Sequence, residues 1–410
     1  MIAHRWPNGA FTNVIGDVPR CTVSPMELGG DGVVARRGQQ PHLPTVTGMS
    51  THVETLIIGA GQAGLATAYH QTPQGRECLV LDGNARVGDS WRQHWDTLRL
   101  YSPAKYNALP GMPFPARAWH YPTKDETADF LETYARTLEL PVRLGVRVLR
   151  VAADGHRFCV DTQDGEYVAS NVVVATGTFG STPYIPDFAG DLDPAIVQLH
   201  SSDYLRADQL PEGPVLVVGA SHSGHDIALE VASRRPVILA GRDCGQIPVP
   251  LESRRMRALF PVLWFVWGKV LNRNTPMGRK GLRHARFHGG PALRVKRADL
   301  LAAGVERFTE RVVGAKDGRP ALADGRVLDV AAVVWATGFQ QRLDWIDPSV
   351  TGDGGWPREQ RGLVAEVPGL YFCGLSFQSS FRSMLIGGVG DDAAYVADRI
   401  VERASVAVAA

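Results

Sequence analysis

The chain has 410 residues, of which 44% are hydrophobic and 21% are charged, and its formal net charge is +1. This length allows two or three domains with an ample core, and the balanced charge argues neither for nor against an acidic partner. The five cysteines include no Cys-x-x-Cys pair, so we expect neither a dithiol reductase nor a metal site.

No run of the sequence reaches the roughly 18 consecutive apolar residues of a membrane span, and the N-terminus has no apolar run of signal-peptide length. We therefore expect a cytoplasmic protein. Residues 1–48 are rich in proline and glycine without a sustained period, which predicts a disordered N-terminal extension. Met49 lies ten residues before Gly59, so Met1 and Met49 are both candidate start residues.

The first nucleotide-binding pattern is a strand, helix and strand predicted at 53–58, 62–69 and 78–81. Its turn reads Gly59-Ala-Gly61-Gln-Ala-Gly64, and Asp82 stands 18 residues after Gly64. Such glycines permit a tight turn and a close approach of a diphosphate to the start of the helix, while the acid binds a ribose hydroxyl. The pattern predicts a dinucleotide with a free ribose.

The region after the first pattern predicts a Pro-rich irregular loop, a helix and three strands, at 101–123, 125–138, 142–151, 158–162 and 172–175. The last of these strands ends in Ala175-Thr176-Gly177.

A second nucleotide-binding pattern then follows, with strand, helix and strand predicted at 214–218, 223–231 and 237–240. Its turn reads Gly219-Ala-Ser221-His-Ser-Gly224, and Arg242 stands 18 residues after Gly224. Serine is small enough for the middle position and can itself bond a phosphate. An arginine at this offset suits a 2′-phosphate, so the pattern predicts NADPH, although Arg242 could also be a plain surface residue.

The rest of the chain predicts two more strands and a closing helix, at 330–335, 370–373 and 390–404. The first of these strands ends in Ala336-Thr337-Gly338, which repeats the motif at 175–177 and marks a second crossing between domains. We predict an α/β fold of two nested Rossmann-like domains, the first at 49–185 and 332–410, the second at 186–331.

The segment 254–297, within a predicted insertion at 252–297, contains 12 Lys or Arg and no Asp or Glu. It includes a strongly apolar run at 258–266, too short to span a bilayer. One interpretation is a helical insertion that covers the substrate channel. The other is a peripheral element that contacts a membrane surface.

Taken together, the motifs resemble those of the class B flavoprotein monooxygenases, which include flavin-containing and Baeyer–Villiger monooxygenases. The matching pieces are GAGQAG, the stretch from Val87 to Arg92, ATG, GASHSG, WATGF and LYFCGL, in family order across residues 53–404. The resemblance implies a glutathione-reductase-like architecture with FAD in the first domain and NADPH in the second. The cofactor-binding residues that it implies are Gly59, Gly61, Gln62, Ala63, Gly64, Asp82, Trp91, Arg92, Gly177, Gly219, Ser221, Ser223, Gly224, Arg242 and Gly338.

The resemblance also implies an activity. NADPH would reduce the flavin, and a C4a-peroxyflavin would transfer one oxygen atom from O2 to a soft nitrogen or sulfur, or to a ketone. No side chain need act as nucleophile, so no catalytic residue is assigned. Small-molecule substrates and O2 are the expected partners, nucleic acid is not, and a homodimer is a possible assembly. The alternatives are an NADPH-consuming flavin reductase or oxidase that makes peroxide, and a non-catalytic redox-sensing module.

Two positions depart from the family pattern. In the interdomain fingerprint, nine residues separate Gly190 from His200 where the family has three, which leaves a structural role for His200 open. Many nitrogen- and sulfur-oxygenating members carry an Asn near the flavin where this chain has Ser102, and Asn107 is nearby but out of register.

Overall fold

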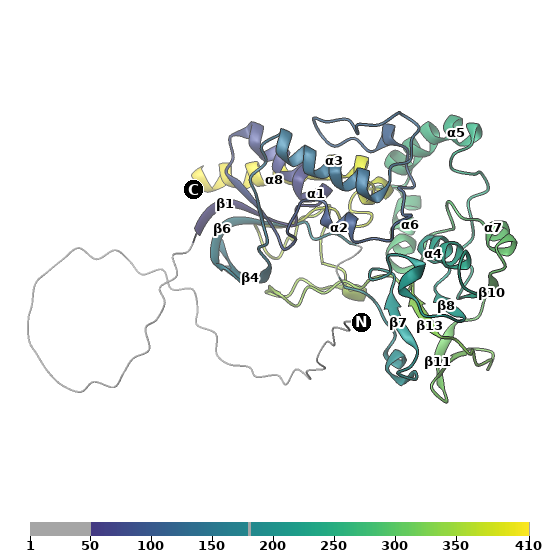
Figure 1. Ribbon diagram of the computed structural model, residues 1–410. Helices are drawn as coiled ribbons and strands as arrows, with labels where there is room; N and C mark the ends of the chain where they lie inside the picture. The colour runs from purple at the N-terminus through teal and green to yellow at the C-terminus, as the bar shows by residue number, and fades with distance from the viewer. Residues whose placement is uncertain (1–50, 179–181, 410) are drawn as a thin grey trace, which may run out of the picture. The chain divides into compact units, whose positions relative to one another are not determined.

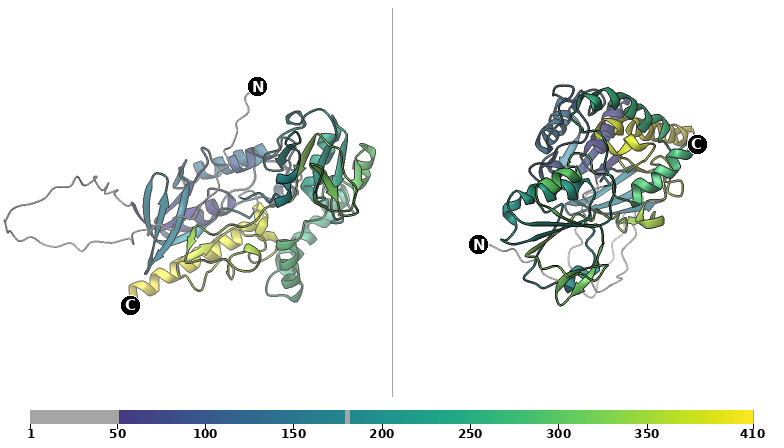
Figure 2. Two further views of the ribbon diagram at one scale, coloured as in Figure 1. Left: turned by 90° about the horizontal axis from the view of Figure 1, so that it is seen from below. Right: turned by 90° about the vertical axis from the view of Figure 1, so that its right-hand side faces the viewer.

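The computed structural model describes residues 51–178 and 182–409 (Figure 1). The predicted disordered extension at 1–48 and the candidate start Met49 lie outside the described residues. Two sheets carry most of the described strands, and Figure 2 shows them as separate groups.

The first sheet has eight strands in the order β14-β4-β5-β6-β1-β2-β3, with β15 beside β6. Strands β1, β2, β3, β6 and β15 run parallel, whereas β5 is antiparallel to both of its neighbours. The strand bounds are β1 Thr51–Ile58, β2 Cys78–Asp82, β3 Val142–Leu144, β4 Val148–Asp154, β5 Arg157–Thr162, β6 Gly165–Val174, β14 Ile346–Asp347 and β15 Leu370–Phe372.

Successive side chains of β1 point to opposite faces of this sheet, as in any β-strand. Ile57 packs in one cluster with residues of α1, α3 and α8, and Leu56 packs in the other with residues 343–375. Figure 1 shows the three helices together over the sheet. The helix bounds are α1 Gln62–Gln71, α2 Asp89–Arg92, α3 Lys124–Thr137 and α8 Val389–Ala409.

The second sheet has five parallel strands in the order β10-β9-β8-β13-β7, with α4 and α7 on one face and a β11–β12 hairpin on the other. Its elements are β7 Val197–His200, β8 Val215–Val218, α4 His222–Ala232, β9 Val237–Ala240, α7 Arg297–Ala302, β10 Glu306–Phe308, β11 Val312–Lys316, β12 Arg319–Leu322 and β13 Ala332–Trp335. The two sheets together confirm the predicted pair of Rossmann-like units.

The predicted insertion contains α5 (Arg254–Phe265), a π-helical turn (Val266–Val270) and α6 (Pro276–Phe287). Ser253 and Thr275 cap the two α-helices by accepting hydrogen bonds from main-chain amides. The short 3₁₀ turns lie at Thr72–Gln74, Ala104–Tyr106, Asp187–Asp191, Ala207–Gln209, Asp353–Gly355, Phe381–Met384 and Ile386–Gly388. Within the described ranges, no helix is both long and apolar enough to cross a membrane.

Two sequence-based expectations need correction. The strand predicted at 142–151 is two strands, because Gly145 adopts a φ of +74° and turns the chain from β3, which pairs with β2, to β4, which pairs with β5. The predicted return to the first domain at residue 332 falls too early. Strand β13 pairs with β8 and β7 in the second sheet, so the crossing follows Trp335.

Candidate functional site

The first glycine turn joins β1 to α1 at the carboxyl end of the parallel strands. Gly59 has a φ of +109°, and a Cβ there would lie 2.6 Å from the carbonyl oxygen of Ala175. A Cβ on Gly64 would overlap the carbonyl oxygen of Gly59. Backbone packing therefore requires both glycines, and it brings the first Ala-Thr-Gly motif directly against the turn.

Gly61 is different, because in the part of the chain that the structure describes a Cβ at this residue would have no neighbouring atom within 4 Å. Gly61 is the N-cap of α1 and provides no side-chain acceptor, whereas Thr123 caps α3 and Ser253 caps α5. The first amides of α1 are thus left for an outside acceptor, and the open space at Gly61 lets that acceptor approach. Gln62 and Ala63 form the start of this helix. This geometry fits a diphosphate.

Asp82 ends β2 beside the same turn. Its Oδ2 accepts a hydrogen bond of 2.6 Å from the Ala60 amide, and its Oδ1 accepts two of 2.8 Å from the amide and side chain of Asn84. These bonds hold the carboxylate at the edge of the turn, where an acid can bind the hydroxyls of a ribose.

The end of β15 completes this site. A Cβ on Gly374 would lie 2.6 Å from the Cβ of Ala63, and Thr178 Oγ1 accepts a hydrogen bond of 2.7 Å from the Ser376 amide. Gly177, with a φ of +81°, lies between the first Ala-Thr motif and Thr178. Gly374 was absent from the predicted site residues, although a glycine directly after a buried strand was the available signal.

The second glycine turn repeats the geometry of the first. Gly219 also has a φ of +109°, a Cβ there would overlap the carbonyl oxygen of Ala336, and a Cβ on Gly224 would overlap that of Gly219. Gly338 follows with a φ of +84°. Each turn therefore packs against its own Ala-Thr-Gly motif, and the sequence duplication is a structural one.

Ser221 is the N-cap of α4, and its hydroxyl does not cap the helix. The hydroxyl instead donates a hydrogen bond of 2.9 Å to the carbonyl oxygen of Gly290, in the segment that returns from the insertion. Ser223 and Gly224 lie in the first turn of α4. A phosphate here would meet main-chain amides, with the Ser221 side chain already engaged.

Arg242 is exposed just beyond β9, and among the described residues no carboxylate pairs with it. Arg307 of β10 lies alongside and donates a hydrogen bond of 2.6 Å to the carbonyl oxygen of Gly241. Arg297 pairs with Asp243. Sequence reasoning missed both arginines, because Arg307 arrives only through the pairing of β10 with β9 and Arg297 only through the packing of the start of α7. The cluster suits a 2′-phosphate.

Arg92 holds α2 against α3. Its guanidinium donates hydrogen bonds of 2.8 Å to both Asp129 and Glu132 and one of 3.1 Å to Asp89. Trp91 is half-buried and contacts clusters of both sheets. In the structure, Arg92 therefore links α2 to α3. That Trp91 and Arg92 lie near the flavin stays a prediction.

His200 ends β7 and is buried. Its Nε2 donates a hydrogen bond of 3.0 Å to the carbonyl oxygen of Gly338, and its Nδ1 accepts one of 3.1 Å from the Ser202 amide. These partners select the neutral ring, and burial lowers the pKa of His200. The contacts support the structural interpretation of His200, which ties β7 to the second Ala-Thr-Gly motif.

Asn107 and Ser102 form a buried pair. Ser102 Oγ donates a hydrogen bond of 2.6 Å to Asn107 Oδ1, and Asn107 Nδ2 donates one of 2.9 Å to the Ser102 carbonyl oxygen. A Cβ on Gly387, two residues before α8, would lie 3.3 Å from the Asn107 nitrogen. The fold therefore places the Asn107 amide directly beside Ser102.

The two dinucleotide units meet at Tyr101 and Asp226. The Tyr101 hydroxyl donates a hydrogen bond of 2.7 Å to Asp226 Oδ2 on α4, while Oδ1 has no hydrogen-bond partner among the described residues. Burial raises the pKa of Asp226 to about 6. The ring of His222, from the second turn, packs edge-on against Tyr101, and Arg294 donates to the Leu100 carbonyl oxygen. Sequence reasoning assigned no role to this junction.

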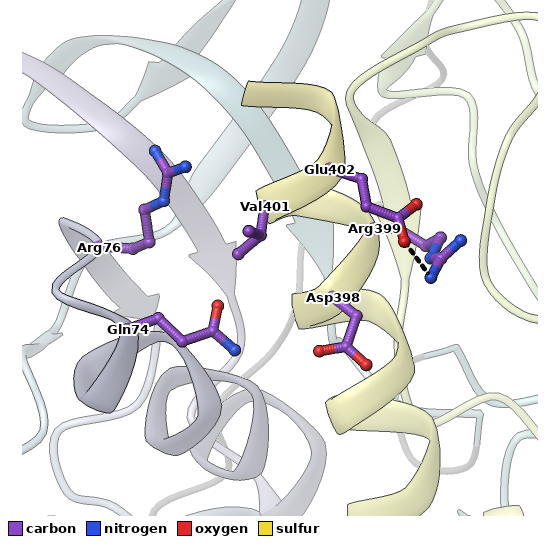
Figure 3. A pocket seen from close by; sticks show the side chains of 6 residues that line it. All are labelled: Gln74, Arg76, Asp398, Arg399, Val401 and Glu402. Carbon is purple, nitrogen blue, oxygen red and sulfur yellow. Dashed lines mark ion pairs between the residues drawn. The ribbon is translucent and has the colours of Figure 1, made fainter. Parts of the chain in front are cut away.

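An open hollow of about 400 Å³ lies between the end of α1 and α8 (Figure 3). Figure 3 shows its lining residues, Gln74, Arg76, Asp398, Arg399, Val401 and Glu402. The hollow adjoins the C-terminal end of α1, whereas the glycine turn lies at the other end of that helix. It is therefore no part of the dinucleotide site.

Comparison with known proteins agrees with this geometry. The family model described as pyridine nucleotide-disulphide oxidoreductase matches residues 56–244. An uncharacterised CzcO-like oxidoreductase of Geobacillus kaustophilus is 37% identical over 359 residues, covering 85% of this chain and 98% of the relative. A probable indole-3-pyruvate monooxygenase of Arabidopsis thaliana, YUCCA9, is 26% identical, covering 72% and 77%. The structure of a flavin-containing monooxygenase from Stenotrophomonas maltophilia has 26% identity and a TM-score of 0.66, covering 86% and 99%.

Fold and site define a flavin-dependent oxidoreductase with two dinucleotide-binding units, and hence an enzyme. The chain belongs to the same family as its CzcO-like oxidoreductase relatives, and it is similar to the class B flavoprotein monooxygenases. FAD and NADPH fit its two dinucleotide-binding units.

Proposed function

We propose that the protein is an NADPH-dependent FAD monooxygenase that inserts one oxygen atom from O2 into a small substrate, at a soft nitrogen or sulfur or at a ketone. The observation that carries the proposal is the repeated glycine turn. Both turns precede a helix without a side-chain cap, and opposite charges, Asp82 and Arg242, stand beside them.

The first turn would hold FAD. The open space at Gly61 and the uncapped start of α1 fit the diphosphate, and Asp82 is held where it can accept hydrogen bonds from ribose hydroxyls. When bound, FAD supplies hydride acceptance and oxygen transfer, so the side chains only bind, orient and exclude water.

The second turn would hold NADPH, with its 2′-phosphate at the exposed Arg242 and the adjacent Arg307. His222 at the start of α4 contacts Tyr101, so a nicotinamide nucleotide bound at this turn would lie next to the loop that carries Ser102 and Asn107. This arrangement supports hydride delivery between the two units.

The buried Ser102–Asn107 pair supports oxygen transfer over simple peroxide release. Both side chains are buried, and the pair lies beside the glycines that precede α8. Buried polar side chains in a fixed arrangement would help to keep water away from a bound flavin, and water access favours the release of peroxide.

The cysteines argue against the thiol chemistry that the family model's name suggests. Cys373 adjoins Gly374 of the first site, and burial raises its pKa to about 12. Burial also raises the pKa of Cys78 to about 11. Both thiols would stay protonated and unreactive at neutral pH, so neither would serve as the nucleophile of a disulfide reductase at the first site.

The test follows NADPH oxidation and peroxide together, under air, in purified yellow protein with and without thioanisole. If sulfoxide forms in proportion to the NADPH oxidised and little peroxide appears, the result would support the monooxygenase. Complete conversion of NADPH to peroxide with sulfides, amines and ketones alike would favour the reductase or oxidase. Bound flavin without turnover would favour the redox-sensing module.

A further inference from the structure

The outer face of α5 is apolar and exposed. Leu259, Val262 and Phe265 follow each other at intervals of three residues and are 39%, 57% and 59% exposed. Side chains at this spacing lie on one side of a helix. Figure 1 shows α5 apart from both sheets.

The inner face of α5 is apolar as well. Met256 and Phe260 are buried with Tyr121 and Leu251, and Trp264 packs beside Phe260. A helix that is apolar on both sides normally has both sides covered. In the described part of the chain nothing covers Val262 and Phe265, and such a patch marks a contact surface.

Basic side chains lie at both ends of this face. Arg254, Arg255 and Arg257 are exposed in the first turn of α5, and Lys269 is exposed in the π-helical turn that follows the helix. No acidic side chain of the described residues pairs with these four. The whole segment 254–297 carries 12 Lys or Arg and no Asp or Glu.

The charges decide between the possible occupants. A second copy would bring the same basic residues against each other, which is unfavourable. Residues 1–50 contain four Lys or Arg and three Asp or Glu, so their charge does not complement this face. An anionic bilayer offers both an apolar interior for Val262 and Phe265 and phosphates for the arginines.

We propose that the outer face of α5 binds the surface of an anionic membrane, with the helix lying in the plane of the interface. Val262 and Phe265 enter the boundary between headgroups and acyl chains, and the basic residues at both ends contact lipid phosphates. The binding is peripheral and reversible, since the apolar face covers only a few turns.

The experiment is co-sedimentation of the full-length, flavin-loaded protein with vesicles of phosphatidylcholine alone or with added phosphatidylglycerol. We expect binding only with phosphatidylglycerol, and we expect high salt to reverse it. Val262→Asp should weaken binding at least about tenfold, and Arg255→Glu should do so about fivefold or more.

Val313→Asp is the matched control, because Val313 lies on β11 and is 55% exposed, nearly as much as Val262. This variant should bind like the wild type, and retained flavin absorbance verifies that each variant is folded. Absence of binding to anionic vesicles, or equal loss in both valine variants, would overturn the proposal. A wild-type dimer that Val262→Asp dissociates would instead assign the face to a second copy. Increased cleavage within residues 1–50 in Val262→Asp would assign it to that segment.

Discussion

Replacing Asp226 by Asn should stabilise the protein above pH 6. Burial raises the pKa of this carboxyl from 3.8 to about 6, despite the hydrogen bond from Tyr101. A raised folded-state pKa means that the native state holds the proton more tightly than the unfolded chain does. The free energy of unfolding therefore falls as the pH rises from about 4 to 6. Above pH 6 the whole of this loss of stability remains.

The cost follows from the two pKa values. At 1.36 kcal/mol per pH unit, the shift corresponds to about 3 kcal/mol at neutral pH, of which about 1.4 kcal/mol develops between pH 5 and pH 8. Asn keeps an acceptor for the Tyr101 hydroxyl, and the weaker bond to a neutral acceptor costs about 1 kcal/mol. We expect Asp226→Asn to gain about 2 kcal/mol at pH 8.

Urea unfolding followed by tryptophan fluorescence at pH 5 and pH 8 measures both quantities. The wild type should lose about 1.4 kcal/mol more than Asp226→Asn over this range. Tyr101→Phe is the comparison variant, because it removes the hydroxyl that donates to Asp226 and keeps the buried carboxyl. This variant should be less stable than the wild type at both pH values. Equal pH dependence in the wild type and Asp226→Asn would refute the reasoning.

The two glycines of the first turn should respond differently to alanine. Gly61→Ala should fold and lose FAD affinity by about tenfold or more, read from flavin absorbance, whereas Gly64→Ala should lower the melting temperature because its Cβ has no room. Arg242→Ala should raise the KM for NADPH about 10- to 100-fold and leave that for NADH nearly unchanged, since a charged hydrogen bond contributes about 1.5–3 kcal/mol. Glu359→Gln should lower the free energy of unfolding by about 3 kcal/mol, because this fully buried carboxylate pairs with two arginines of the insertion. Asn107→Ala should increase the share of NADPH that ends as peroxide in the coupled assay.

Matched variants separate these effects from general damage. Arg157→Ala removes an exposed arginine of β5, in the first sheet, and should leave both KM values unchanged. Glu366→Gln breaks the exposed pair with Arg358 and should cost less than about 1 kcal/mol. Ser102→Ala keeps the Asn107 amide and should uncouple less than Asn107→Ala. Equal effects within any of these pairs would contradict the corresponding assignment.

The glycine turns were predictable because their requirements are local. A strand, a turn and a helix in immediate succession place Gly59, Gly61 and Gly64 with no help from distant residues. Asp82 was predictable for a related reason, since the helix length fixes where the next parallel strand ends. The same argument located Gly219, Gly224 and Arg242.

The contacts between distant segments could not be read from the sequence. Arg307 reaches the second site only through strand pairing, and Asp226 meets Tyr101 only where the two units join. The contact of Asn107 with Ser102 was not predictable from residue spacing, because it depends on the 3₁₀ turn at Ala104–Tyr106, which folds Asn107 back onto Ser102. The strand break at Gly145 depended on a left-handed conformation that the strand pattern does not reveal.

The packing of Ala175 and Ala336 against the turn glycines bears on how the cofactors associate. Because protein carbonyls fix both turns, they have their shape before a dinucleotide arrives. Ordering one residue of backbone costs about 1–2 kcal/mol, and a preformed turn avoids this cost at the moment of binding. The apoprotein should therefore be preorganised, so that reconstitution with flavin is a docking step rather than a folding step.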